Sequence, residues 1–171
     1  MNNDSHFLEF TKPFVDAVKN VFETMVYTKI ETQKPIIKTD SVLRGDISAI
    51  IGLSGDIDKE GSGGHYKAML VISFPYDTYF KVASAMLGEP YTSYVPDIKD
   101  LGGEIVNMVM GNAKRDLKVL GYSSNMAIPS MFEGKGHSIN YPSGTRMLLI
   151  PFDSVHGQLF MELCYSEDEQ T

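Results

Sequence analysis

The sequence predicts an α+β fold in which long amphipathic helices pack on a mainly antiparallel sheet. Two stretches, at about 6–27 and 98–120, repeat apolar residues at helical spacing. Each is followed by short apolar runs separated by glycine and proline, as in a series of strands and turns. Helices and strands segregated along the chain in this way are typical of helices that cover one face of an antiparallel sheet.

The first half of the chain begins with the helix at 6–27. Pro13 lies inside this stretch, so we expect this proline either to start the main helix or to kink it. Extended chain, two strands and the hairpin loop between them follow. Their expected bounds are 28–38 for the extended chain, 44–55 and 65–74 for the strands, and 56–64 for the polar, glycine-rich loop.

A shorter helix is expected next, beginning at Pro75 and ending at Gly88. A linker at 91–96 leads to the central helix at about 98–120, which ends at Gly121. Four strand-like runs complete the chain. They lie near 125–132, 137–141, 145–152 and 158–165.

The chain has 171 residues, enough for one domain with a sizeable core. A weak repeat relates 12–20 to 99–107, since the lysines, the asparagines and two apolar positions align. We therefore expect two related halves packed about a pseudo-twofold axis, with Ala17 standing where Glu104 stands in the second half. The expected ranges are 6–90 for the first half-repeat, 97–165 for the second and 166–171 for a solvated acidic tail, all within a single domain 1–171.

Composition narrows the class of protein. The formal net charge is −7 and no dense run of lysine and arginine is present, which argues against nucleic acid as a partner. Cys164 is the one cysteine, so no internal disulfide can form and a reducing compartment is expected. The chain shows no signal-peptide pattern and no apolar run long enough to span a membrane. We therefore expect a cytoplasmic protein that does not bind membranes.

The central helix carries the strongest indication of function. Glu104 and Asn107 are three residues apart and therefore share one face of the helix, away from its apolar stripe. Gly103 and Gly111 are expected beside them on the exposed face, although each interior glycine costs a helix about 1 kcal/mol relative to alanine. A missing side chain lets another molecule approach closely. Two alternatives remain: ordinary solvent-facing polar residues, and glycines that pack against the other half of the repeat.

A longer pattern surrounds this pair. Asp100, Glu104 and Asn107 form Asp-x-x-x-Glu-x-x-Asn, followed by Gly-Asn-Ala at 111–113 and by Pro129 a little over twenty residues after the asparagine. This arrangement resembles the signature of the CheC/CheX/FliY chemotaxis phosphatases. Asn-Val-Phe-Glu-Thr-Met, near the end of the first helix, resembles the CheX-type members. CheX-type members have one active motif where CheC-type members have two, and the missing acid in the first half fits the one-site type.

The resemblance spans about 7–165 and implies a protein phosphatase that acts on the aspartyl phosphate of a CheY-type response regulator. Asn107 would orient a water molecule in line with the phosphorus, and Glu104 would pair with a lysine of the regulator. Phosphoryl transfer of this kind is catalysed by positioning and charge stabilisation. The regulator, not this chain, would bring Mg²⁺. Family members of this type dimerise through their sheets, so a homodimer is expected.

Other residues are expected to contact the regulator beside this catalytic pair. They are Asp100, Gly103, Gly111 and Lys114. Two other functions remain open: a non-catalytic module that binds a response regulator or a component of the flagellar switch, and a small-molecule site built from the nine tyrosines and nine phenylalanines. The four histidines are dispersed and no paired cysteines occur, so we expect no metal or cofactor bound by the chain itself.

Overall fold

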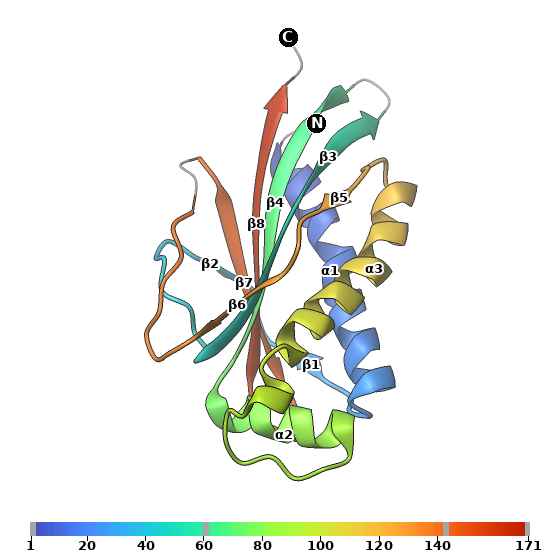
Figure 1. Ribbon diagram of the computed structural model, residues 1–171. Coiled ribbons are helices and arrows are strands. Elements are labelled where there is room, and N and C mark those ends of the chain that lie inside the picture. Colours follow the sequence, from blue (N-terminus) through green and yellow to red (C-terminus); the bar gives the residue numbers. More distant parts are fainter. Residues whose placement is uncertain (1–2, 60–61, 142–143, 170–171) are drawn as a thin grey trace.

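The computed structural model describes residues 3–59, 62–141 and 144–169. Within these residues the chain forms three α-helices, one 3₁₀ turn and eight strands (Figure 1). The helical segments are α1 (Asn3–Met25), α2 (Tyr76–Leu87), η1 (Pro96–Ile98) and α3 (Leu101–Val119). The strands are β1 (Glu31–Thr32), β2 (Ile36–Ile37), β3 (Ile47–Lys59), β4 (Ser62–Phe74), β5 (Asn125–Met126), β6 (Ser130–Glu133), β7 (Arg146–Asp153) and β8 (Leu159–Glu169).

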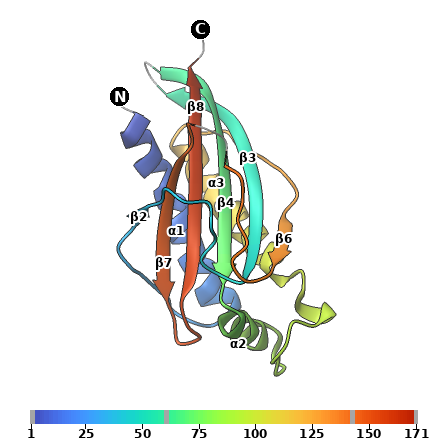
Figure 2. The same ribbon diagram turned by 90° about the vertical axis from the view of Figure 1, so that its left-hand side faces the viewer.

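The strands form a single antiparallel sheet with the order β1-β7-β8-β4-β3-β5. Strand β2 pairs with β7 beside β1, and β6 pairs with β3 beside β5. The centre of the sheet is the long β3–β4 hairpin together with β8, the last strand of the chain (Figure 2). Two short strands at each edge complete the sheet.

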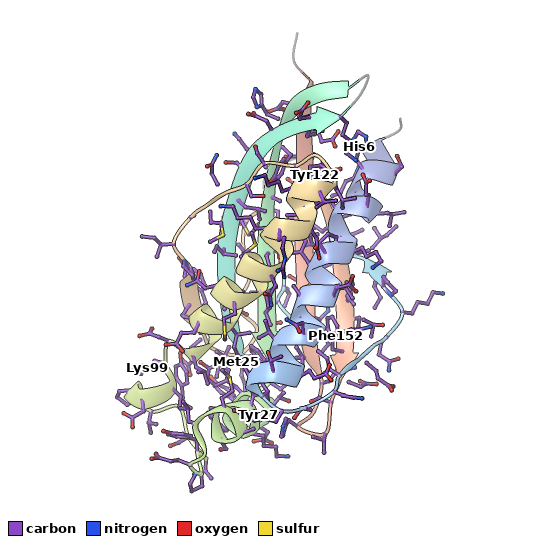
Figure 3. The ribbon with its side chains drawn as sticks, turned by 90° about the vertical axis from the view of Figure 1, so that its right-hand side faces the viewer. His6, Met25, Tyr27, Lys99, Tyr122 and Phe152 are labelled. Atoms are coloured by element: carbon purple, nitrogen blue, oxygen red, sulfur yellow. The ribbon has the colours of Figure 1, made fainter. Side chains whose placement is uncertain are left out.

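Helices α1 and α3 lie side by side on one face of this sheet (Figures 1 and 3). They run in opposite directions, because His6 near the start of α1 and Tyr122 just after α3 lie at the same end of the molecule (Figure 3). Helix α2 covers the other end of this layer. The predicted α+β fold is therefore confirmed. Helix α1 runs through Pro13 without interruption, so the proline does not mark the start of this helix.

An aromatic cluster joins α1 to the sheet and to the end of α3. The ring of Phe10 is fully buried, and its centroid lies 4.7 Å from that of Tyr165, 5.0 Å from Tyr66 and 5.2 Å from Tyr122. Tyr66 donates a hydrogen bond to the carbonyl oxygen of Ser123 at 2.7 Å, in the turn that follows α3. These buried rings are part of the core, as their apolar faces and satisfied hydroxyl groups require.

The expected hairpin loop and the expected acidic tail both contribute residues to strands in the structure. Residues 56–59 continue β3, with Ile57 buried between exposed Asp56 and Asp58, the alternation of a half-buried strand. The tip of this hairpin, 60–61, lies outside the described residues. The expected acidic tail continues β8 as far as Glu169, and its Glu167 carboxylate is 2.9 Å from Nδ1 of His6. Residues 170–171 lie outside the described part.

Two other expected bounds are wrong. Residues 137–141 form no strand and contribute only an isolated bridge between Val42 and Ser138. The central helix begins at Leu101 rather than at 98, because Pro96–Ile98 forms a separate 3₁₀ turn. The second helix, α2, matches its expected bounds: Pro75 precedes it, and Gly88 ends it in the left-handed conformation with φ 71°.

The opposite face of the sheet contains a buried charged cluster. Lys38, in the segment after β2, donates a hydrogen bond to Glu162 in β8, and each side chain is only 1% exposed. Tyr141 donates a second hydrogen bond, of 2.8 Å, to the other carboxylate oxygen of Glu162. The Lys38 ammonium group also lies 5.6 Å from the centroid of the Tyr141 ring. This cluster ties two irregular segments, near residues 38 and 141, to the central strands.

Candidate functional site

Five residues of α3 form one exposed line along the helix. Their spacing alternates between three and four residues, which keeps them on one face over about 21 Å at 1.5 Å per residue. We call this line the α3 stripe. It consists of Glu104, Asn107, Gly111, Lys114 and Lys118, all of them exposed. The acid lies in the first turn and the second lysine in the last, an order that suits the helix dipole.

Glu104 and Asn107 are available to a partner molecule. Within the described residues, neither side chain makes a hydrogen bond or an ion pair. Asp100 is also exposed and stands immediately before the helix, where its carbonyl oxygen accepts a hydrogen bond of 3.1 Å from the backbone N–H of Glu104. A carboxylate and a neutral amide therefore project together from one rigid element. The amide offers both a donor and an acceptor to a partner or to a water molecule.

Gly103 does not lie on this exposed face, so that expectation is wrong. It is buried, and a Cβ atom added there would lie 3.6 Å from Cβ of Pro129 and 3.8 Å from Sδ of Met131. At its neighbour Gly102, an added Cβ would approach Cε of Met131 to 2.9 Å. These glycines let the chain that returns along β5 and β6 pass close to the first turn of α3. Gly111, in contrast, is exposed with nothing within 4 Å of an added Cβ.

The sequence pattern does not predict that the chain after α3 packs against the side of this helix. On the helical wheel of α3, Gly103 and Met110 fall just past the edge of the apolar stripe, and both are buried in the structure. The helix is covered from the side by 125–133 as well as from beneath by the sheet. Pro129 is the one residue of the sequence motif that indicates this packing. It lies beside Gly103, so the proline and the start of α3 are neighbours in the structure.

The position in the first half that aligns with Glu104 is buried. Ala17, which aligns with Glu104 in the expected repeat, is buried with 3% of its surface exposed. This position of α1 therefore faces the core rather than a partner. The pseudo-twofold repeat itself stays a prediction.

A groove of about 550 Å³ lies at the far end of the α3 stripe. It is lined by Asp56 and Asp58 of β3, by Lys114 and Lys118, and by the turn at 121–124. Both signs of charge face this groove, so it has no clear preference for an anion or a cation. Among the described residues, no group of three or more histidine, cysteine, aspartate or glutamate side chains could hold a metal ion.

The open surface at Gly111 allows a direct test. We expect Gly111→Ala to raise the free energy of unfolding by about 1 kcal/mol, because alanine is the better helix former and its methyl group meets no neighbour. If a partner approaches closely here, the same variant weakens partner binding, which isothermal titration would measure. Asp116→Ala, exposed on another side of the helix, is the matched control. Unchanged affinity in Gly111→Ala would remove this glycine from the contact surface.

None of the helices in the described part of the chain has the length and apolar character of a membrane span.

Comparison with curated protein sequences gives no significant match. Solved structures match closely. The CheC-like superfamily protein from Shewanella sp. PV-4 is 33% identical with a TM-score of 0.81, and the alignment covers 97% of this chain and 99% of that one. The chemotaxis protein CheX from Vibrio vulnificus is 34% identical with a TM-score of 0.79, covering 92% and 99%.

A third structure includes a partner. It is the complex of CheX, CheY, BeF₃ and Mg²⁺ from Borrelia burgdorferi, in which the matched chain is 25% identical to this one with a TM-score of 0.70, covering 94% of this chain and 98% of that one. A sequence model of the family described as chemotaxis phosphatase CheX matches residues 47–153, well over half of the chain and including the whole of α3. This chain therefore belongs to the CheX family.

Proposed function

We propose that this protein is a phosphatase that hydrolyses the aspartyl phosphate of a CheY-type response regulator in chemotaxis signalling. The observation that carries the proposal is the pair Glu104 and Asn107, exposed one turn apart on α3 and without hydrogen bonds inside the described chain. Family membership supplies the class of activity. The Borrelia burgdorferi complex supports the class of partner, since a CheX there is bound to CheY with BeF₃ and Mg²⁺.

The chemistry requires little from this chain beyond placement. A water oxygen attacks the phosphorus, the bond to the aspartyl oxygen breaks, and the regulator recovers its carboxylate while inorganic phosphate leaves. Asn107 would bind the attacking water through its amide and hold it in line with the breaking bond. An acyl phosphate is already a reactive compound, so orientation of the water supplies most of the acceleration. Mg²⁺ held by the regulator would stabilise the charge on the phosphoryl oxygens.

Glu104 would fix the register between the two proteins. A carboxylate one turn before Asn107 can pair with a lysine ammonium group at the rim of the regulator's active site. A hydrogen bond between charged groups contributes more than one between neutral groups, particularly where water is excluded. Asp100 and Lys114, exposed at either side of the pair, would extend the contact along the helix.

The direct test is to follow loss of phosphate from a phosphorylated CheY-type regulator with Mg²⁺, with and without the purified protein. We expect the regulator to lose its phosphate faster in proportion to the amount of protein added, until the regulator is saturated. Every response regulator encoded in the same genome should be assayed. No acceleration with any of them would exclude the enzymatic function and leave binding alone.

Replacing the acid should weaken the complex more than the chemical step. We expect Glu104→Gln to raise KM by about tenfold with kcat within a factor of two, because the substitution keeps the shape of the side chain but removes a charge that pairs across the interface. Glu23→Gln, which removes an exposed carboxylate from α1, is the matched control. An equal effect of both substitutions would show that net charge, not a specific pair, governs association.

We also propose that the protein forms a homodimer, as expected from its family. Size-exclusion chromatography with light scattering would measure the mass in solution. A mass of about 19.0 kDa, that of one chain, at all concentrations would contradict this.

A further inference from the structure

Helix α3 begins without help from the side chain that precedes it. The first N–H groups of a helix have no partner inside the helix and are usually satisfied by a capping side chain. Asp100 occupies the capping position, but its side chain makes no capping hydrogen bond. Glu104 and Asn107 lie in the first two turns, so the direction of the helix at its start decides where both project.

The hydroxyl group of Tyr79 takes the place of the missing cap. It accepts a hydrogen bond of 3.0 Å from the backbone N–H of Gly102, the second residue of α3. It also donates a hydrogen bond of 2.5 Å to the carbonyl oxygen of Ile98, the last residue of η1. One buried oxygen thus joins the 3₁₀ turn to the first turn of α3, and it belongs to a different helix, α2.

Tyr79 is itself held firmly. Its side chain is fully buried, and its ring centroid lies 5.4 Å from that of Phe74 and 5.9 Å from that of Tyr94, both in edge-on contact. Burial raises the pKa of Tyr79, with smaller contributions from the negative charges of Asp100 and Glu104. The hydroxyl group therefore keeps its proton and can donate and accept at the same time.

We propose that Tyr79 is a positioning residue for the α3 stripe. Its hydroxyl group fixes the start of α3 and thereby the placement of Glu104 and Asn107. This inference rests on the proposed phosphatase function. Asn107 lies five residues after Gly102, about 7.5 Å along the helix. A small change in tilt at Gly102 therefore displaces the amide, and a misplacement of about 1 Å in a positioned group can reduce a rate by about a hundredfold.

The test compares two tyrosines that differ in place but not in chemistry. Tyr79→Phe removes the bridging hydroxyl group and keeps the ring. Tyr66→Phe removes the hydroxyl group of a tyrosine that is only 1% exposed and that also makes two hydrogen bonds, but at the opposite end of α3. Both variants and the wild type are assayed with phosphorylated CheY-type regulator and Mg²⁺ at a temperature where thermal melts show all three fully folded. Amide hydrogen exchange at Gly102 is measured in parallel.

We expect Tyr79→Phe to lower kcat by about tenfold with KM within a factor of two, since orientation of the water is lost while the contact surface remains. The Gly102 amide should exchange faster in this variant and not in Tyr66→Phe, which should keep the kcat of the wild type. Equal kcat values in the two variants, or unchanged exchange at Gly102, would overturn the positioning role. An inactive wild type would instead overturn the phosphatase function, and the exchange data would still decide whether Tyr79 holds the helix.

Discussion

Asn107→Ala is expected to reduce dephosphorylation at saturating regulator by about a hundredfold, with little change in KM. This variant lacks the amide that we propose orients the water, while Glu104 and the rest of the α3 stripe would still be present to bind the partner. The rate cannot fall below that of the regulator alone, so the measurement needs a regulator whose own hydrolysis is slow. Rapid-mix fluorescence or loss of radioactive phosphate would follow the reaction.

Asn112→Ala is the matched control for this experiment. It removes an amide of the same size from the same helix, but from a half-buried position off the stripe. We expect its kcat to equal that of the wild type. Equal activity of Asn107→Ala and the wild type would exclude a role for this amide in catalysis. The protein would then be a binding module whose partner is recognised without hydrolysis.

Lys38→Met is expected to be strongly destabilising, lowering the free energy of unfolding by about 3–5 kcal/mol. Its partner Glu162 is 1% exposed and would remain buried without a counter-charge. Tyr141 would still donate one hydrogen bond to the carboxylate, which is too little to replace an ammonium group. Equilibrium unfolding in guanidinium chloride measures the difference, provided that the slope with denaturant is unchanged.

The double variant Lys38→Met/Glu162→Leu distinguishes the cost of an unpaired buried charge from the cost of altered packing. Removing both charges leaves no buried ion, so we expect the double variant to be more stable than Lys38→Met alone, even though it carries one more substitution. A double variant as unstable as the sum of the two single variants would show that packing, not charge, explains the loss. The exposed pair Lys12 and Asp16 offers a control, since exposed pairs contribute less than about 1 kcal/mol.

The parts of the fold that follow from local pattern were predictable from the sequence. Apolar spacing predicts α1 and α3, and Pro75 and Gly88 predict the ends of α2, because helix ends depend on neighbouring residues. The sequence pattern does not predict a strand at 56–59, because the alternation is short and three of the four residues are charged. The ends of β8 and of the hairpin depend on pairing with distant strands, which no local pattern contains.

The candidate site divides in the same way. Glu104, Asn107, Gly111 and Lys114 were placed together by helical geometry alone, and the structure exposes all four. The burial of Gly103 does not follow from helical geometry, because Pro129 and Met131, which lie beside it, come from a distant part of the chain. The sequence does not indicate a role for Tyr79, since a tyrosine on the apolar side of a helix is expected to be a core residue. Its role depends on a hydrogen bond from the backbone N–H of Gly102, which only the structure shows.

The position of β8 has a consequence for how the chain reaches this state. This strand is made last among the described elements, yet it lies inside the sheet, where it pairs with both β7 and β4. Until it arrives, β4 and β7 both present unpaired edges, the kind of surface on which chains associate wrongly. The aromatic cluster at Phe10 is also incomplete without Tyr165. The sheet can therefore be completed only after residues 159–169 have been synthesised. A truncated chain that lacks these residues should aggregate rather than fold.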